Sequence, residues 1–156
     1  MSKKRNYLRL SVASAFLLSG CGIGTPTLRT GDGRLQRCPD LPHCVSSVEG
    51  ELARRSIEPI RYRGDREAAR RSLLSALRER PRTEIVTDTT DYIHAEATTL
   101  LSRYVDDVEF VFGPGDGVIQ VRSSSRIGYY DFDTNRERIE QLRTAFHLQI
   151  PEAATP

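Results

Sequence analysis

The chain has 156 residues, of which 38% are hydrophobic and 28% are charged, so it is long enough for one domain with appendages. Its formal net charge is +2, but four basic residues lie within the first nine positions. Without residues 1–20 the chain has 19 basic and 21 acidic residues and no basic run, which argues against nucleic acid as a partner.

The first twenty residues are typical of a secretory signal peptide that ends at a lipidation site. Residues 1–9 carry four basic side chains and no acidic one, and residues 10–18 form an apolar run too short to span a bilayer permanently. The sequence Leu-Ser-Gly-Cys at 18–21 resembles the lipobox of bacterial lipoprotein precursors. We therefore expect the mature chain to start at Cys21 and to be held at a membrane by acyl chains. An ordinary signal peptide with a nearby cysteine is the alternative.

The sorting of such a lipoprotein depends on the residue after the lipidated cysteine. Here it is Gly22 and not aspartate, which favours the outer membrane, with the domain facing the periplasm. Residues 22–37 are rich in glycine, threonine and arginine without apolar periodicity. Together with the lipidated cysteine they are predicted to form a flexible tether over 21–37.

Two further cysteines, Cys38 and Cys44, remain after lipidation of the first. An even pair in an oxidising compartment predicts a disulfide, which would stabilise the fold by about 2–3 kcal/mol. A zinc site is the less favoured reading, because two cysteines separated by five residues lack the spacing and the second pair of typical zinc sites. No cofactor is expected.

The folded part is predicted to begin near Cys38 and to contain two helices. Residues 56–62 give a short edge strand interrupted by Pro59. Residues 64–81 follow a helical spacing of alanine and leucine, with Asp65 as the expected N-cap and a proline as the stop. The second helix is predicted over 134–148, where Thr134 and Glu137 have the spacing of a capping box.

Between the helices the apolar period changes to two. The predicted strands cover 83–88, 92–99, 103–112 and 118–127, and turn sequences separate them. Consecutive strands joined by hairpins predict an α+β domain over 38–148, in which a four- or five-stranded antiparallel meander carries both helices on one face. Residues 149–156 are expected to form a disordered tail.

Alternation along the strands places six ionisable side chains on the face opposite the apolar one, since directly opposed residues share a face. The predicted ligand-binding residues are His94, Glu96, Asp107, Glu109, Arg122 and Arg126.

A solvated surface with cross-strand ion pairs is the plain alternative to a binding site on this face. A metal bound by His94 and the carboxylates is a further, less favoured reading. Asp106 falls on the apolar face, where we expect it to bond Ser123 or Ser125, since a buried unpaired carboxylate is unfavourable.

Four ordered motifs carry a family resemblance. CPDLPHCVSS, DYIHAE, YVDDVEF and VRSSSRIGYYDFDTNRERI resemble the DUF1499 family of unknown function, over roughly Cys38 to Leu148. The chain departs from the family pattern at His43, where the family has asparagine, and at Asp133, where it has glycine. The latter change raises the question whether the aspartate caps the helix instead of adopting a positive φ. The resemblance implies no established activity.

Two functions remain open from the sequence. The first is a non-catalytic envelope lipoprotein that binds a partner protein, a glycan or a lipid head group through the polar sheet face. The second is a periplasmic hydrolase or transferase, in which His94, Asp107 or Glu109 acts as acid or base while two arginines hold an anionic substrate. The sequence contains no nucleophile elbow or phosphate loop, so no catalytic residue is assigned.

Overall fold

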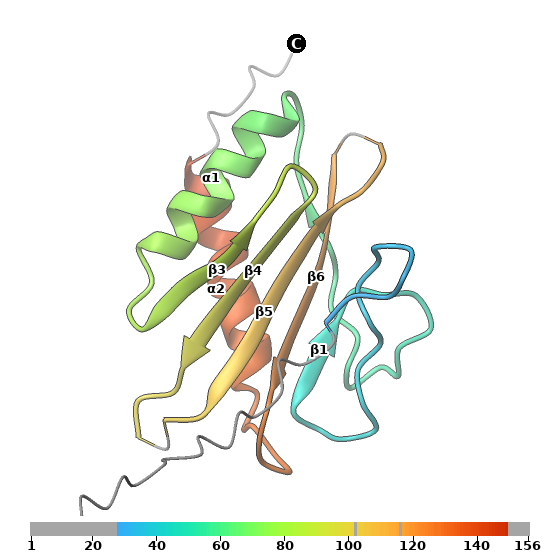
Figure 1. Cartoon of the computed structure of the whole chain (residues 1–156), viewed down its shortest axis with the longest axis vertical. Helices are drawn as coiled ribbons and strands as arrows, with labels where there is room; N and C mark the ends of the chain where they lie inside the picture. Colours follow the sequence, from blue (N-terminus) through green and yellow to red (C-terminus); the bar gives the residue numbers. More distant parts are fainter. Residues whose placement is uncertain (1–27, 102, 116, 150–156) are drawn as a thin grey trace, which may run out of the picture.

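The computed structural model of the chain describes residues 28–101, 103–115 and 117–149 (Figure 1). The predicted signal peptide over 1–20, the lipidation site at Cys21 and the tail after position 149 lie outside these residues. None of the helices in the described part is both long and apolar enough to cross a membrane.

The domain is an antiparallel sheet with two helices. Its elements in chain order are β1 (Cys44–Ser46), β2 (Ile60–Arg61), α1 (Arg66–Arg78), β3 (Thr83–Asp88), β4 (Tyr92–Thr98), β5 (Val105–Phe112), β6 (Val118–Ser125) and α2 (Thr134–Gln149). The strand order is β1-β6-β5-β4-β3, and β2 also pairs with β6. The predicted α+β meander is therefore confirmed. Strand β1 was not predicted, because three residues are too few to display a period of two.

At the start of each helix, the side chain of an aspartate accepts a hydrogen bond from a backbone N–H of the first turn. At α1, Asp65 accepts a hydrogen bond from the backbone N–H of Ala68 at 2.6 Å, as the sequence predicted. At α2 the prediction was wrong about the capping residue, because Thr134 already lies in the helix. The side chain of Asp131 accepts from the backbone N–H of Asn135 at 3.1 Å instead, and it satisfies one of the open amides of the first turn.

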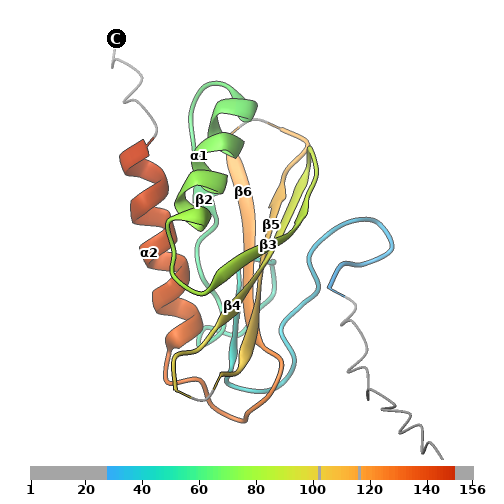
Figure 2. The same ribbon diagram turned by 60° about the vertical axis from the view of Figure 1, so that its left-hand side comes forward.

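Both helices pack on the same face of the sheet (Figure 2). Fully buried side chains fill the space between the layers, and they include Leu73 and Leu77 of α1, Val108 and Phe110 of β5, Val121 of β6, and Ile139, Leu142 and Phe146 of α2. These residues follow the helical and strand periods of the sequence. The hydrophobic core therefore lies on the predicted apolar face.

The start of the described chain lies on the opposite side of the sheet from the helices (Figure 2). Leu35 is buried, and the guanidinium of Arg29 lies 4.5 Å from the ring centroid of Tyr92 on β4. Residues 28–37 were predicted to belong to the tether, whereas Arg29 and Leu35 of this segment pack against the domain. Cys38 and Cys44 follow directly and are joined by a disulfide, with their Cα atoms 5.7 Å apart.

Candidate functional site

The register of β4, β5 and β6 brings the six predicted ionisable residues together. His94 lies opposite Glu109, Glu96 opposite Asp107, and Glu109 opposite Arg122. The sequence-based alignment of the strands is therefore confirmed. Four of the six side chains belong to buried residues, and only Glu96 and Arg126 are partly exposed.

Glu109 is the centre of one buried group. It has no exposed surface, and its carboxylate accepts from Arg122 Nη1 at 2.7 Å and from the hydroxyl of Tyr92 at 3.0 Å. Burial raises the pKa of Glu109, although Arg122 and the Tyr92 hydroxyl oppose this. Burial and the adjacent carboxylate likewise raise the pKa of Tyr92, so this phenol stays a hydrogen-bond donor.

Asp107 is the centre of a second group. Its carboxylate is 2.8 Å from His94 Nε2 and accepts two hydrogen bonds from Arg126, at 2.7 and 3.0 Å. Arg126 also donates to Glu96. Burial acts to raise the pKa of Asp107, but the hydrogen bonds from His94 and Arg126 outweigh it and the pKa is lowered. Its bonds to the two carboxylates raise the pKa of Arg126 in turn.

One subset of this group has the residue types of a metal site. One ligand atom each from His94, Glu96 and Asp107 lies within 4.8 Å of the others. The guanidinium of Arg126, however, bonds to both carboxylates, so a cation already occupies the position that a metal ion would need. The three residues therefore fit an ion-pair network better than a metal centre.

The polar face is consequently a paired network and not an open row of charges. Its acids are engaged by arginines, a histidine or a tyrosine, and Arg29 lies across one end, over Tyr92. Of the six predicted residues, Glu96 lines a cavity of about 570 Å³, whose wall also includes Arg82, Glu84 and Arg103. The sequence predicted which side chains meet. It did not predict how deeply they are buried, because alternation along a strand shows which face a side chain shares and not what covers that face.

Asp106, on the helix side of the sheet, has a different partner from the one expected. The prediction that it bonds Ser123 or Ser125 was wrong, because Arg138 of α2 donates to its carboxylate at 2.5 Å. The two serines are bonded to Asn135 instead. A long side chain from the helix thus reaches the buried acid, and strand alternation alone cannot reveal such a contact.

Asn135 is a structural residue that the sequence analysis missed. It is fully buried, and its amide donates to the His43 carbonyl at 3.0 Å and to Ser125 Oγ at 3.1 Å while it accepts from Ser123 Oγ at 2.6 Å. The available signal was its position one helical turn before Ile139, in line with the apolar stripe of α2. A polar residue on such a stripe indicates a buried hydrogen-bond network.

A larger cavity opens on the helix side, at the end of the molecule where β4 meets β5 and β6 leads into α2. Its volume is about 630 Å³, within the range of small-molecule sites. Exposed apolar side chains surround it, and we call them the apolar rim: Leu100, Leu101, Tyr104, Ile127, Tyr130 and Phe132.

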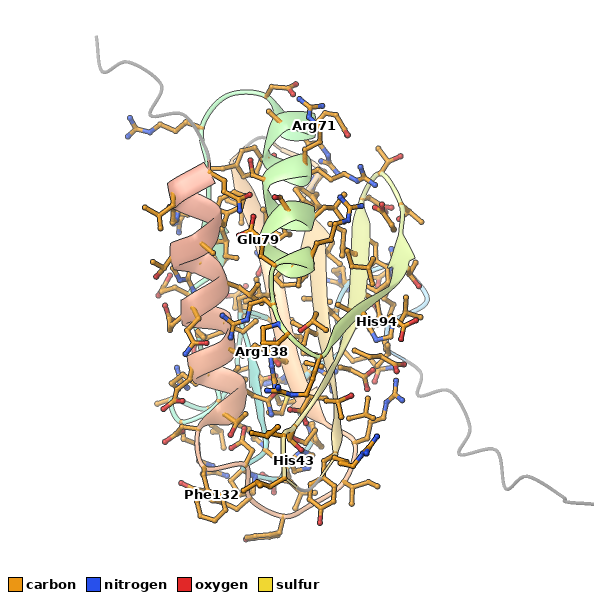
Figure 3. All side chains as sticks on the ribbon, turned by 90° about the vertical axis from the view of Figure 1, so that its left-hand side faces the viewer. His43, Arg71, Glu79, His94, Phe132 and Arg138 are labelled. Atoms are coloured by element: carbon orange, nitrogen blue, oxygen red, sulfur yellow. A yellow bond between two sulfur atoms is a disulfide. The ribbon has the colours of Figure 1, made fainter. Side chains whose placement is uncertain are left out.

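The polar residues of this cavity come from the ends of both helices and from the sheet. Arg80 follows α1, Arg138 and Gln141 belong to α2, and Asp106 lies on β5. In Figure 3, Arg138 lies between α2 and the sheet, and Phe132 lies at the end of the molecule below it. An apolar rim with polar groups inside is the usual composition of a ligand-binding cavity.

Two side chains of the apolar rim are almost fully exposed to solvent. Leu101 is 94% exposed and Phe132 is 82% exposed, although the ring of Phe132 is 5.1 Å from that of Tyr130. Phe132 also has a φ of 53°, a strained conformation for a bulky residue, and the next residue, Asp133, has a φ of 62°. Asp133 therefore adopts a positive φ, a conformation that glycine accepts more readily. Strained loops with exposed apolar side chains are typical of functional sites.

The cavity was not predicted from the sequence, because its rim comes from two loops that are distant in sequence and carry no catalytic motif.

Comparison with known proteins places the domain in a family. Residues 34–146 match the family described as "Protein of unknown function (DUF1499)". The chain therefore belongs to this family. No curated protein matches the sequence.

Proposed function

We propose that this member of the DUF1499 family is a lipid-anchored binding protein of the bacterial cell envelope, without catalytic activity. The lipobox at 18–21 supports an anchor of acyl chains on Cys21, and Gly22 supports the outer membrane with the domain on the periplasmic side. The disulfide between Cys38 and Cys44 is consistent with an oxidising compartment.

We further propose that the ligand binds in the cavity of about 630 Å³ and not on the polar sheet face. The single observation that carries this choice is the apolar rim around the cavity, which exposes six large apolar side chains at one end of the molecule. Water solvates such a surface poorly, so covering it with a ligand is favourable. Of the expected partners, a lipid head group, a glycan or an envelope protein, those with an apolar part fit this rim best.

The polar sheet face fits a structural role better. Glu109 has no exposed surface and Asp107 very little, so neither carboxylate is open to a ligand. The same burial disfavours the alternative of a hydrolase or transferase. His94 and Asp107 are bonded to each other beneath the surface, and an acid or base must come within hydrogen-bond reach of its substrate.

The proposal is tested with the full protein extracted from its own envelope and analysed by native mass spectrometry. We expect a small-molecule adduct on the wild type that is lost from a double variant of the rim, Leu101→Ser with Phe132→Ser. Leu52→Ser is the matched control, because Leu52 is also an exposed leucine but does not line this cavity. The absence of an adduct, or an adduct that the rim variant retains, would contradict binding in the cavity.

A further inference from the structure

The charges inside the larger cavity indicate the chemistry of its ligand. Arg80 is partly buried at the cavity wall, and its guanidinium donates to Gln141 of α2. Among the described residues no carboxylate forms an ion pair with it, and the charge that acts on it most directly is the guanidinium of Arg138. Burial first, and then Arg138, lower the pKa of Arg80. A partly desolvated cation beside a second cation attracts an anion.

The acids of the same cavity are engaged elsewhere or are exposed. Asp106 is paired with Arg138. Asp131 accepts from the backbone N–H and the amide of Asn135 at the start of α2. Glu137 is exposed on the first turn of that helix. Arg138 therefore has its counter-ion. Arg80 and Arg82 also line the cavity, and neither forms an ion pair among the described residues; of these two, Arg80 is partly buried and Arg82 is exposed.

Apolar side chains complete the cavity on its open side. The rim comes from residues 100, 101 and 104 before β5 and from residues 127, 130 and 132 after β6, while Arg80 follows α1 and Arg138 belongs to α2. A ligand that satisfies both parts has a negative charge at one end and an apolar chain at the other. A sugar or a free inorganic anion satisfies the guanidinium alone and leaves the apolar rim exposed.

We propose that this cavity binds single molecules of a lipid with an anionic head group, with the head at Arg80 and the acyl chain along the apolar rim. This inference rests on the proposed binding function and specifies its ligand class. It gives Arg80 the role of recognising the head group, and it gives Leu101 and Phe132 the role of covering the chain. Arg138 keeps its ion pair with Asp106 and places a second positive charge nearby.

The test uses the full chain carrying Cys21→Ser, so that acyl groups on the protein do not compete with the probe. Sodium laurate is titrated calorimetrically below its micelle concentration. Sodium acetate supplies the same head without a chain, and dodecyl maltoside supplies a chain of the same length without a charge. We expect saturable binding of laurate, no detectable binding of acetate, and binding of dodecyl maltoside that is weaker by about tenfold or more.

Variants then assign the head and the chain to their residues. Arg80→Gln is expected to weaken laurate binding by about tenfold or more, since it removes a charged hydrogen bond, and to leave dodecyl maltoside unaffected. Arg78→Gln is the matched control, because Arg78 is an exposed arginine near the same helix end that does not line the cavity. Phe132→Ser is expected to weaken both probes. Thermal melting of each variant verifies that it is folded.

The outcomes separate this inference from the proposed function. Equal binding of laurate and dodecyl maltoside, or laurate binding that Arg80→Gln does not change, overturns the assignment of the head group. Laurate that binds only as vesicles or micelles overturns the assignment of a single-molecule site and indicates surface docking. An envelope adduct that is lost in the rim variant but is a glycan or a peptide overturns the lipid while the binding function stands. Failure of both experiments refutes both proposals.

Discussion

At the scale of single residues, the buried pair of Glu109 and Arg122 decides whether the polar sheet face is structural. We expect Arg122→Ala to lower the free energy of unfolding by about 3–5 kcal/mol, because it leaves Glu109 buried without its counter-ion. Urea denaturation followed by circular dichroism measures this change.

Arg71→Ala is the control for that substitution. The ion pair of Arg71 with Glu67 is exposed, so its loss is expected to change the free energy of unfolding by at most about 1 kcal/mol. A similarly small change for Arg122→Ala would contradict the buried network. It would indicate that the polar face is solvated and open to a ligand, as the sequence alone allowed.

Asp107 is expected to make the fold sensitive to acid. Its pKa is lowered in the folded protein, so its stabilising contribution is present above the unfolded value of about 3.9 and is lost as the pH falls through the folded value. Glu109 acts in the opposite direction: its pKa is raised, so its protonation favours the folded state as the pH falls.

The substitution Asp107→Asn isolates the first of these effects. We expect it to lower the free energy of unfolding at neutral pH, because His94 and Arg126 lose the negative charge that they contact. The difference from the wild type is expected to shrink as the pH falls below about 4, where the carboxyl group of the unfolded chain becomes protonated, and to vanish below the lowered pKa of the folded state. Urea denaturation at a series of pH values measures it, and a difference that stays constant from neutral pH to acid would refute the assignment.

At the scale of secondary-structure elements, Asn135 attaches the start of α2 to β6 and to the residue before β1. We expect Asn135→Ala to lower the free energy of unfolding by about 2–3 kcal/mol, since it leaves the buried His43 carbonyl and two serine hydroxyls without this partner. Thr144→Ala, at an exposed position of the same helix, is expected to change it by less than about 0.5 kcal/mol. Chemical denaturation of both variants compares them, and equal effects would contradict the role of Asn135.

The elements that the sequence predicted are those with a clear period. The two helices and the strands β3 to β6 contain enough turns or alternations for the apolar residues to reveal the buried face. The same alternation predicted that Glu109 and Arg122 meet. Hydrogen bonds between the helix layer and the sheet, such as that from Arg138 to Asp106, were not predicted. The partner of such a long side chain depends on how the helix is placed on the sheet.

The short or irregular parts could not be predicted in the same way. β1 has three residues, and residues 28–37 resemble a linker in composition although Leu35 is buried. The cavity is formed by the loop before β5 and the loop after β6 together with residues at α1 and α2. No local sequence pattern therefore predicts it. The ionisable residues of the polar sheet face can be recognised in the sequence, whereas the shape of a cavity cannot.

At the scale of the whole molecule, the anchor and the binding cavity act together in the proposed function. Residues 22–27 separate Cys21 from Leu28, the first described residue, and a connection of seven Cα–Cα steps reaches at most about 25 Å when fully extended. In the proposed function, so short a connection keeps the domain, and with it the cavity, near the membrane surface.

The last prediction tests this anchor through Cys21→Ser. Because the acyl chains require the cysteine thiol, we expect the variant to lack acyl mass and to accumulate as unprocessed precursor or to leave the membrane fraction. Mass spectrometry and fractionation of the envelope measure these changes. The thermal midpoint of the purified domain is expected to remain unchanged, since position 21 precedes residues 34–146, which match the family. Serine at position 22 in place of Gly22 is the control, because it leaves the thiol intact and is expected to preserve acylation. A Cys21→Ser protein with normal acyl mass would refute the lipid anchor without affecting the case for the cavity.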